Sequence, residues 1–424
     1  MSVPRPKFDP GQLSPAGLSD ESDGHGQALD QRLADVDSSF SAAIANGLAH
    51  LTAEDEELNG RVVTLHGRKH VNFGSCSYLG LETDLRLKDA ACDAVARFGV
   101  QFSTSRAYVS APPYRELEQL LGAIFEAPLV VAPTTTLAHL AALPVLVGKH
   151  DAVICDQLVH SSVQTVLPIL AAAGATCSLV RHNRMDRLHD AVATLSRRHA
   201  RVWYLADGIY SMHGDSAPMG ALRALLDRHE RLHLYMDDAH GVSWSGRHGR
   251  GHVLGANPIH PRMVVALSMA KSFAASGGVL VFPDQEWARL VRTCGSTLIF
   301  SGPLQPPVLG AAIASARVHL SNEIHERQAK LSERIRLFND LAGEHGLPLA
   351  TTEATPIRFV KTGESATTYR VATELMKEGF YTNTALYPAV SRGHGGVRIT
   401  LTVHQTLDDV RGLVEALARN LRAA

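Results

Sequence analysis

The sequence predicts an α/β protein, in which a large domain built on a mostly parallel seven-stranded sheet is followed by a smaller α+β domain. Three observations support this fold class. Short apolar segments recur about every 30 residues between 151 and 263, which is the spacing of βαβ units. The segments between them are predicted to be helices that end at glycine, and strands such as VVALS are apolar throughout, as expected of strands buried on both faces. The pattern changes after Pro303.

The N-terminal region is expected to form an arm and a helix. Residues 1–26 are rich in Pro, Gly, Ser and Asp and poor in apolar residues, which predicts disorder. Apolar residues from Leu29 to Leu48 recur with helical spacing. The expected organisation is an N-terminal arm and helix at 1–70, a large domain at 71–303 and a small C-terminal domain at 304–424.

Most elements can be placed from the sequence. A hairpin is expected at 62–65 and 70–73, and a helix at 137–147. The seven strands of the large domain are expected at 129–132, 151–156, 176–181, 201–206, 232–237, 263–268 and 277–282. The small domain is expected to contain a helix at 305–341 with a break, strands at 356–361 and 396–402, a helix at 367–378 and a last helix from Leu407, which Thr406 and Asp409 could cap.

The composition is that of an ordinary globular protein. Of 424 residues, 45% are hydrophobic and 20% are charged, and the formal net charge is -1. This near-neutral balance argues against nucleic acid or an anionic membrane as the main partner. The first residues form no apolar signal segment, and no apolar run reaches the ~20 residues of a membrane-spanning helix. Five scattered cysteines without a C-x-x-C pair argue against disulfides and a zinc site, and they favour a cytoplasmic protein.

The most informative segment is LHLYMDDAHGVSWSGRHGRG at 232–251. Here an apolar strand ends in Asp237 and Asp238, which Ala-His-Gly follows. In open α/β sheets, ligands bind at the carboxyl ends of the strands. An acid in this position can hold a cation or a protonated ring nitrogen, although an isolated pair of aspartates is more often a helix cap or a solvated pair.

Lys271 lies in VVALSMAKSFAASGGVLVF at 264–282, directly after a buried strand and among small residues. A desolvated lysine has a lowered pKa and can form a Schiff base, although a surface lysine is an equally common outcome in such a place. Thr134, Thr135 and Thr136 precede the helix predicted at 137–147, and a hydroxyl-rich helix start either binds phosphate or supplies an N-cap. A lysine, an acid and phosphate donors are together what pyridoxal 5'-phosphate (PLP) requires.

The order of these motifs resembles that of the α-oxoamine synthases, a family of fold-type I PLP enzymes. The family includes amino-oxononanoate synthase, 2-amino-3-ketobutyrate ligase, 5-aminolaevulinate synthase and serine palmitoyltransferase. Matching segments cover most of residues 70–424 in the order of the family: NFGSCSYLGLE (72–82), FSTSRAYVSAPPYRELEQLL (102–121), APTTTLAHLAALPVLVG (132–148), DQLVHSS (156–162), RHN (181–183), DGIYSMHGDSAP (207–218), MDDAHGVSWSGRHGRG (236–251), SMAKSFAASGG (268–278), IFSGPLQPP (299–307) and VRITLTVHQTLDDV (397–410).

The resemblance implies a role for each matching residue around the cofactor. Lys271 forms the Schiff base with the cofactor, and Asp237 holds the pyridinium nitrogen. His240 bonds the phenolic oxygen, and His160 stacks on the ring. These four are the implied catalytic residues. The other implied cofactor-binding residues are Thr135, Thr136 and Ser268 at the phosphate, Asp207 and Ser211 near the ring, and Ser301 and Gly302, which reach the phosphate of a neighbouring subunit.

The resemblance also implies residues on the substrate side. Arg398 corresponds to the arginine that binds the amino-acid carboxylate. Cys76 stands where members of the family usually have Asn, in a region near the acyl-donor site. Ser105 stands where glycine-restricted aminolaevulinate synthases tend to have Thr, which permits serine or alanine as well as glycine. Cys76 and Ser105 are therefore candidate substrate-binding residues beside Arg398.

The implied activity is that of a PLP-dependent acyltransferase. It condenses a small amino acid (glycine, alanine or serine) with an acyl-CoA or acyl-carrier-protein thioester, releases carbon dioxide and free thiol, and forms an α-amino ketone. A homodimer is also implied, because fold-type I sites are generally built at a subunit interface. Another fold-type I enzyme, such as an aminotransferase or an aldolase-type lyase, is the alternative. A third hypothesis is a non-catalytic partner subunit. Such a subunit commonly lacks the lysine, so the presence of Lys271 argues against it.

Overall fold

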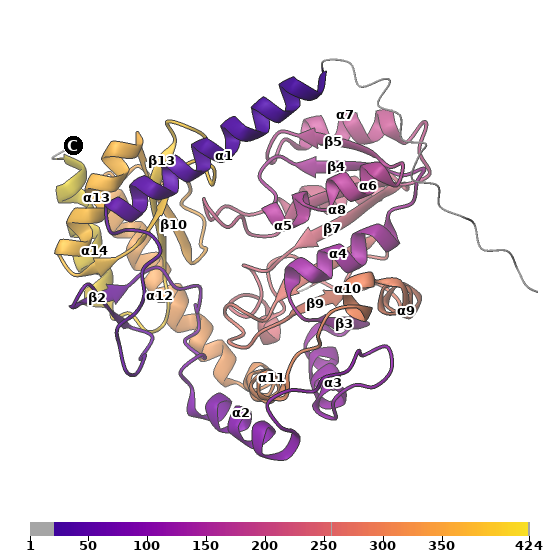
Figure 1. Ribbon diagram of the computed structural model, residues 1–424, viewed down its shortest axis with the longest axis horizontal. Helices are drawn as coiled ribbons and strands as arrows, with labels where there is room; N and C mark the ends of the chain where they lie inside the picture. The colour runs from indigo at the N-terminus through magenta and orange to yellow at the C-terminus, as the bar shows by residue number, and fades with distance from the viewer. Residues whose placement is uncertain (1–20, 256, 423–424) are drawn as a thin grey trace, which may run out of the picture.

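The computed structural model describes residues 21–255 and 257–422, which form two lobes (Figure 1). The large lobe is built on a seven-stranded sheet, and the small lobe on a three-stranded sheet. The strands of the large lobe are β3 (Leu129–Ala132), β4 (Ala152–Asp156), β5 (Thr176–Val180), β6 (Val202–Asp207), β7 (Leu232–Asp237), β8 (Met263–Ser268) and β9 (Gly278–Val281). All seven strands predicted for this sheet are present, and the α/β fold class is confirmed.

The seven strands lie in the order β3-β9-β8-β7-β6-β4-β5. Only β9 is antiparallel to its two neighbours, and the other pairs are parallel. The parallel strands β6, β7 and β8 therefore end at the same edge of the sheet, where Asp207 lies beside Asp237 in register. This edge is where a doubly wound sheet places its ligand site.

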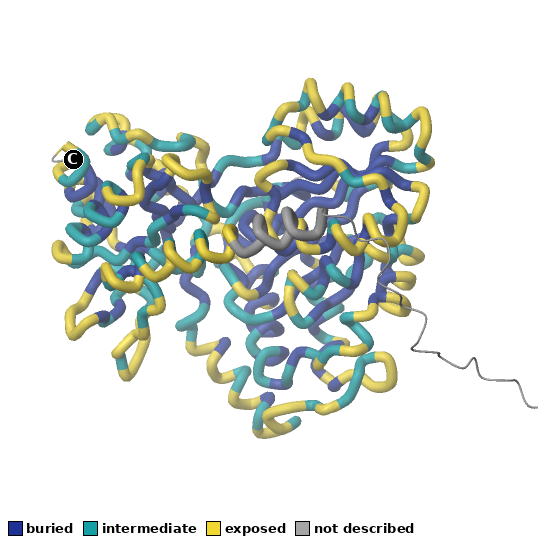
Figure 2. The backbone as a smooth tube through the Cα atoms, turned by 45° about the horizontal axis from the view of Figure 1, so that its top comes forward, coloured by how far each residue is buried: buried dark blue, intermediate teal, exposed yellow. Residues whose placement is uncertain are grey.

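Helices cover both faces of the large sheet because alternate strand residues point to opposite sides. Ile154 and Tyr204 pack on one side, and Val153 and Trp203 on the other. The first face is covered by α3 (Pro113–Phe125), α7 (Met185–Leu195), α8 (Met219–Arg228) and α11 (Pro306–His319). The second is covered by α4 (Thr135–Leu146), α5 (Ser161–Gln164), α6 (Leu167–Ala172) and α9 (Gln285–Cys294). Figure 2 shows the strands of this lobe as a buried core.

Two short helices complete the large lobe. Helix α2 (Leu85–Phe98) packs along α11, and α10 (Ser296–Ile299) packs against α4. The segment that connects α10 to α11 carries Phe300, which is exposed. Among the described residues, no helix combines the length and the apolar character that a membrane span requires.

The small lobe is built around a second apolar core, to which Leu87, Ile209, Ala314 and Val318 of the large lobe also contribute. Its sheet has the antiparallel order β10-β13-β12, made of β10 (Ile357–Gly363), β12 (Asn383–Ala385) and β13 (Gly395–Thr400). The helices α12 (Glu323–Glu344), α13 (Ser365–Lys377) and α14 (Leu407–Arg422) pack on it. The predicted hairpin, β1 (Val62–Leu65) and β2 (Arg68–Asn72), pairs with β11 (Phe380–Tyr381), so this N-terminal segment belongs to the small lobe.

The expectation for the N-terminal arm is wrong at its C-terminal end. Helix α1 spans Glu21–Ala45, so residues 21–26 are helical where disorder was predicted for 1–26. The rest of the predicted arm, residues 1–20, lies outside the described residues. Helix α1 lies against the small lobe, where the Tyr369 hydroxyl donates a 3.0 Å hydrogen bond to the Ser39 carbonyl. The break expected in the helix at 305–341 is found between α11 and α12.

Candidate active site

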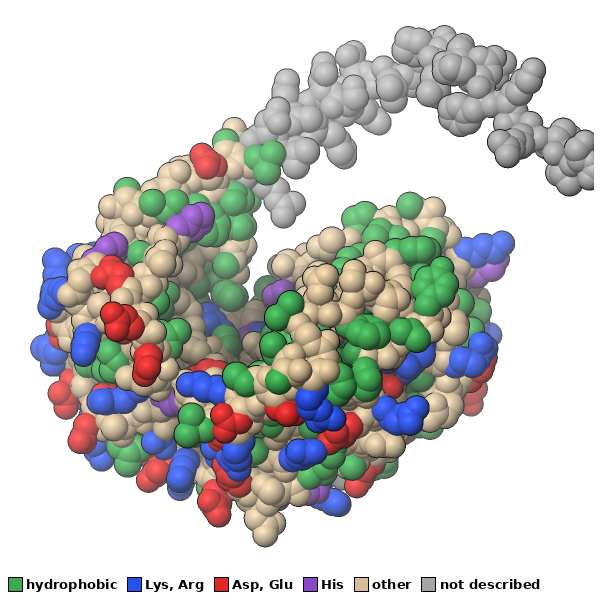
Figure 3. Space-filling view, turned by 60° about the horizontal axis from the view of Figure 1, so that its bottom comes forward, with side chains coloured by type: hydrophobic (Ala, Val, Ile, Leu, Met, Phe, Trp, Pro, Cys, Tyr) green, Lys and Arg blue, Asp and Glu red, His purple; other side chains and the backbone are tan. Residues whose placement is uncertain are grey.

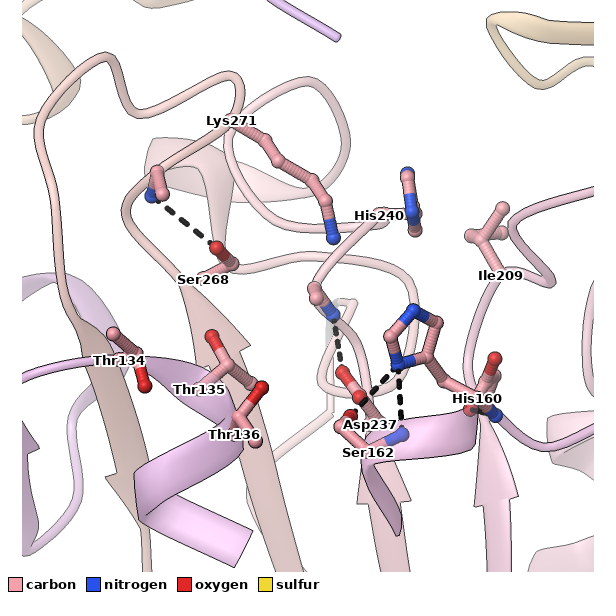
Figure 4. A pocket seen from close by; sticks show the side chains of 13 residues that line it. Thr134, Thr135, Thr136, His160, Ser162, Ile209, Asp237, His240, Ser268 and Lys271 are labelled. Atoms are coloured by element: carbon pink, nitrogen blue, oxygen red, sulfur yellow. Dashed lines mark hydrogen bonds between the residues drawn. The ribbon is translucent and has the colours of Figure 1, made fainter. Parts of the chain in front are cut away.

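The carboxyl ends of β6, β7 and β8 and the N-termini of α4 and α5 surround one cavity (Figure 4). Figure 4 shows the Lys271 amine and the Asp237 carboxylate pointing into the same space, with the three threonines on one side and the two histidines on the other. The lining residues are Thr134, Thr135, Thr136, His160, Ser162, Asp207, Ile209, Asp237, Ala239, His240, Ser268, Ala270 and Lys271. The cavity thus collects eight of the residues predicted to contact the cofactor: Thr135, Thr136, His160, Asp207, Asp237, His240, Ser268 and Lys271.

Asp237 is buried and carries a network of hydrogen bonds. The Ala239 amide donates to Oδ1 over 2.9 Å, and His139 Nε2 donates to Oδ2 over 3.0 Å. The other ring nitrogen of His139 lies 2.8 Å from the Tyr235 hydroxyl. Burial by itself raises the pKa of Asp237, but His139, the charge of Lys271 and the Ala239 amide together lower it to about 2. Asp237 is therefore ionised at neutral pH.

Lys271 follows β8 in a tight turn, in which the Ala274 amide donates to the Lys271 carbonyl over 2.9 Å. Burial lowers the pKa of its amine, and the negative charge of Asp237 partly opposes this effect. Ser268, at the end of β8, accepts a 3.2 Å bond from the Ala270 amide and so helps to shape the same turn. An amine with a lowered pKa loses its proton more readily and is a better nucleophile.

Two histidines line the cavity opposite Lys271. The Tyr78 hydroxyl lies 2.8 Å from His240 Nδ1, and burial together with the charges of Lys271 and Arg398 lowers the pKa of His240 well below its usual value. His160 Nδ1 lies 2.7 Å from the Ser162 hydroxyl, and burial lowers the pKa of His160 as well. Both rings are therefore neutral at neutral pH.

Asp207 lies beside Asp237 and behaves differently. Its Oδ1 accepts a 3.0 Å bond from the His160 amide. Burial raises the pKa of Asp207 well above its usual value, and the nearby negative charge of Asp237 raises it further. The pKa values of these two neighbouring carboxyl groups are thus shifted in opposite directions, and Asp237 is the one whose negative charge is favoured.

The N-terminus of α4 supplies hydrogen-bond donors. Thr134 caps the helix, because its hydroxyl accepts a 3.1 Å bond from the Leu137 amide. The Thr135 hydroxyl donates to the Leu267 carbonyl over 3.2 Å. Within the described residues, the amides of Thr135 and Thr136 donate to no protein acceptor, as expected for the first turn of a helix. These amides and the helix dipole make this wall suited to an anion.

Arg398, Ser211 and Cys76 meet between the two lobes. Arg398 projects from β13 of the small lobe, and its Nε donates a 2.6 Å bond to the Ser211 carbonyl of the large lobe. Its Nη2 lies 3.7 Å from the Cys76 sulfur. Figure 3 shows that the molecular surface is hollowed between the two lobes. None of the three residues lines the cavity of Lys271, although the charge of Arg398 is near enough to influence the pKa of His240.

The remaining predicted residues lie elsewhere. Ser105, Ser301 and Gly302 line a second cavity, together with the segment 101–104, Ile299, Phe300, Pro303 and Gln305. The Ser105 hydroxyl donates to the Ile299 carbonyl over 2.6 Å, and the Ser301 hydroxyl donates to the Thr297 carbonyl over 2.5 Å. Within one chain these three residues are therefore not brought to Lys271.

Five lining residues were not among the predicted site residues: Thr134, Ser162, Ile209, Ala239 and Ala270. Two residues that support the site from behind the lining were not predicted either. His139 holds Asp237, and Tyr78 holds His240. A histidine on the apolar helix 137–147 is a weak signal, because a buried histidine more often bonds within the core than at a site. Tyr78 lies in the quoted segment NFGSCSYLGLE but carries no signal of its own.

Comparisons with known proteins agree with this arrangement. The family model described as aminotransferase class I and II matches residues 68–417. The chain is 31% identical over 381 residues to an 8-amino-7-oxononanoate synthase of Maricaulis maris, a match that covers 89% of this chain and 93% of that protein. It is 30% identical over 359 residues to an 8-amino-7-oxononanoate synthase of Symbiobacterium thermophilum, covering 84% of this chain and 89% of that one.

The fold is also similar to solved structures. A serine palmitoyltransferase solved with PLP as an internal aldimine superposes with a TM-score of 0.82 at 23% identity, covering 95% of this chain and 99% of that chain. This likeness extends over both lobes. The chain belongs to the aminotransferase class I and II family, within its α-oxoamine synthase branch, and it has the fold-type I architecture of PLP enzymes.

Proposed function

We propose that the protein is a PLP-dependent acyltransferase that condenses a small amino acid (glycine, alanine or serine) with an acyl thioester, releasing carbon dioxide and free thiol and forming an α-amino ketone. The proposal rests on one arrangement: the Lys271 amine and the ionised Asp237 face the same cavity, which the N-terminus of α4 closes. The likeness to 8-amino-7-oxononanoate synthases over most of the chain favours this reaction over transamination or aldol cleavage.

The chain's own groups fit PLP. The donors of Thr135 and Thr136 would hold the phosphate, with Ser268 at the same wall. Asp237 is a buried anion aimed into the cavity, as a protonated ring nitrogen requires. The neutral ring of His240, with Tyr78 on Nδ1, leaves an Nε2–H to donate to the phenolic oxygen. When bound, PLP supplies an electron sink that stabilises negative charge at the amino acid's Cα.

The protein groups divide the remaining work. The Lys271 amine, whose pKa burial lowers, would hold the cofactor covalently; once the substrate amine has displaced it, the freed amine would be placed to take the proton from the amino acid's Cα. Asp237 keeps the ring nitrogen protonated, because a facing anion raises a pyridine pKa. His160 would pack on the ring, and Asp207 accepts a hydrogen bond from the His160 amide, which positions it. Arg398, with Ser211 and Cys76 beside it, binds the substrate carboxylate and so decides which bond at Cα is broken.

Product analysis tests the reaction. Holoenzyme supplied with one amino acid and one acyl thioester, on CoA or on a carrier protein, is expected to release free thiol and carbon dioxide in equal amounts, with an α-amino ketone as the product by mass. Lys271→Ala is expected to abolish turnover and the cofactor's absorbance band. Transfer of the amino group to a keto acid without thiol release would instead identify an aminotransferase.

We propose further that the protein is a homodimer, in which Ser105, Ser301 and Gly302 serve the site of the partner. Phe300 lines their cavity and is 86% exposed, and Tyr108, whose amide donates to the Ser105 carbonyl over 3.0 Å, is 87% exposed. Large apolar groups exposed together are typical of interfaces. Analytical ultracentrifugation is expected to give a dimer, and Phe300→Asp is expected to dissociate it; an active monomer would contradict the proposal.

We also propose that the protein works in the cytoplasm. All five cysteines are free, and Cys155 is buried. Free thiols persist in a reducing compartment. Fractionation of expressing cells is expected to recover the activity with the cytoplasmic fraction.

A further inference from the structure

His182 lies between two carboxylates that come from different parts of the large lobe. It follows β5, and its Nδ1 lies 2.9 Å from Asp156 Oδ1, while its Nε2 lies 2.6 Å from Asp215 Oδ2. Asp156 is the last residue of β4 and is buried, whereas Asp215 lies in the loop 208–216 that follows β6. The imidazole therefore joins a strand end of the sheet to that loop.

Both ring nitrogens of His182 have to donate a hydrogen bond. An ionised carboxylate only accepts, and a neutral imidazole has a single N–H. Asp156 is ionised, because it also accepts bonds from the Leu158 and Asn183 amides and from the Tyr204 hydroxyl. Burial lowers the pKa of His182, but the two carboxylate bonds outweigh burial and raise this pKa to about 9. The ring is thus an imidazolium at neutral pH.

The loop 208–216 transmits this anchoring to Arg398. The Tyr210 amide donates to the Asp215 carbonyl over 2.9 Å, and the Gly214 amide donates to the Tyr210 carbonyl over 3.0 Å, which closes a short turn. Ser211 lies in this turn, and its carbonyl accepts the 2.6 Å bond from Arg398 Nε. His182 thus holds this turn at Asp215, and the turn in its place holds the Arg398 guanidinium at the Ser211 carbonyl.

The same loop is a contact between the lobes. The Thr355 hydroxyl of the small lobe donates to the Gly214 carbonyl over 2.6 Å, and the Ser216 amide donates to Glu353 Oε2 over 3.1 Å. The small lobe therefore holds the loop from one side. On the side of the large lobe, the loop is held by Asn183, whose side-chain amide donates to Asp215 Oδ2 over 3.4 Å and to the Ser216 carbonyl over 3.1 Å, and by His182. Of these two anchors only His182 can carry a charge, and its ring also packs edge-on against Tyr210 with the ring centroids 4.3 Å apart.

We propose that His182 is a positioning residue for the amino-acid substrate: as an imidazolium it fixes the loop 208–216 and thereby the guanidinium of Arg398. The inference rests on the proposed role of Arg398 in binding the substrate carboxylate. It assigns His182 to the binding of that carboxylate alone. The groups at Lys271 and Asp237 do not depend on it.

A binding experiment separates this role from a merely structural one. Holoenzyme is titrated with alanine and, separately, with ethylamine, which lacks the carboxylate, and the cofactor's absorbance gives each Kd. In His182→Gln the Kd of alanine is expected to rise about tenfold, while the Kd of ethylamine stays unchanged. An equal rise for both compounds, or no rise for either, overturns the inference. His189→Gln is the matched control, because His189 on α7 bonds His229 at the end of α8 rather than the loop, and neither Kd should change.

A double-mutant cycle tests whether His182 acts through Arg398. Once Arg398→Gln has removed the guanidinium, His182→Gln is expected to cause no further rise in the Kd of alanine. Additive effects of the two substitutions would overturn the inference. If His182→Gln does not fold, Asp215→Asn serves in its place: it keeps the shape of the partner but removes its charge, and the same selective loss is expected in smaller measure.

The pH dependence gives an independent readout. His182 faces titratable groups from β4, from β6 and from the loop: Asp156, Tyr204, Tyr210, His213 and Asp215. Above about pH 9 the ring loses a proton and one of the two carboxylate bonds. The ratio of the alanine Kd to the ethylamine Kd, with each Kd corrected for the protonation of the free amine, is therefore expected to rise above that pH in the wild type and to stay flat in His182→Gln.

These titrations do not measure acyl transfer. The proposed function and the proposed role of His182 can therefore be contradicted independently of each other. A protein that binds alanine with the expected selectivity but releases no thiol contradicts the proposed function only. A wild-type protein that binds alanine no more tightly than ethylamine overturns the inference about His182, whatever its activity.

Discussion

Asp237 keeps a negative charge in a position where burial opposes charge. It does so because the Ala239 amide and His139 donate to its two oxygens and Lys271 lies nearby. Asp237 and Lys271 could be predicted from the sequence, since each follows a clearly apolar strand. His139 could not, because its contact spans 98 residues of the chain and nothing local distinguishes it from a core histidine.

Replacing His139 tests this support. In His139→Leu the pKa of Asp237 is expected to rise, because burial is then less well opposed. Apo-protein titrated with PLP and followed by absorbance is expected to show about a tenfold weaker Kd, the factor that one pKa unit represents.

Tyr235→Phe is the control for that substitution. It removes the hydroxyl on the far nitrogen of His139 but leaves the 3.0 Å contact with Asp237. A smaller loss of PLP affinity is expected than in His139→Leu. If His139→Leu bound PLP as tightly as the wild type, His139 would not be the support of Asp237.

Asp238 shows how strongly the neighbourhood of a carboxyl decides its charge. It is buried beside Asp237, and its Oδ2 accepts a 2.9 Å bond from the Val253 amide. Glycine is required around it, since a Cβ on Gly241 would lie 2.0 Å from Asp238 Oδ1. Burial raises the pKa of Asp238 to about 8, and the charge of Asp237 contributes to that rise.

Asp238 is therefore expected to make stability pH-dependent. Its folded-state pKa lies above the unfolded value of 3.8, so the folded protein retains a proton that the unfolded chain loses, and stability falls as the pH rises from about 4 to 8. Asp238→Asn cannot titrate and keeps an acceptor for Val253. We expect calorimetry to show that the Tm of Asp238→Asn minus the Tm of the wild type increases as the pH is raised from 5 to 8. A difference in Tm that stays constant over this range would contradict the raised pKa.

At the scale of elements, α14 begins as its sequence predicts. The Thr406 hydroxyl accepts a 3.1 Å bond from the Asp409 amide, and Asp409 Oδ2 accepts a 2.7 Å bond from the Thr406 amide, which confirms the capping box. The structure adds what the local sequence could not indicate: Arg61, from the N-terminal hairpin region, donates two 2.8 Å bonds to the same carboxylate.

Removing this carboxylate is expected to destabilise the small lobe. Asp409→Ala leaves the Thr406 amide without its acceptor and Arg61 without its partner, at an expected cost of about 1–2 kcal/mol in the free energy of unfolding. Asp408→Ala changes an exposed acid in the same helical turn and is expected to cost less than about 0.5 kcal/mol. Urea denaturation measures both, and equal effects would show that the cap contributes nothing specific.

The elements that could be predicted are those with strong local patterns. The strands of the large sheet are buried on both faces, so their sequences are apolar throughout, and all seven were predicted. β11 and β12 were not, because each has only two or three residues and forms by pairing with distant strands. The start of α1 was misplaced, since a segment rich in Asp, Gly and Ser gives no helical periodicity to mark it.

At the scale of the whole molecule, the site is shared between the lobes. The large lobe carries Lys271, Asp237 and the α4 N-terminus, whereas the small lobe carries Arg398 on β13. Lobe arrangement could be predicted only in outline, because the pairing of β2 with β11 joins residues more than 300 positions apart. The order of the two lobes along the chain does not indicate which surface of the large lobe faces the small lobe.

This division has a consequence for inactivation. The contacts that bring Arg398 to the site include polar bonds between the lobes, such as those of Gly214 and Ser216, whereas the groups predicted to hold the cofactor lie on the large lobe alone. Gentle warming or dilute denaturant should loosen the hinge-like junction first. The enzyme would then lose its activity before it loses its cofactor. Its solution would still be yellow when the protein no longer binds the substrate carboxylate.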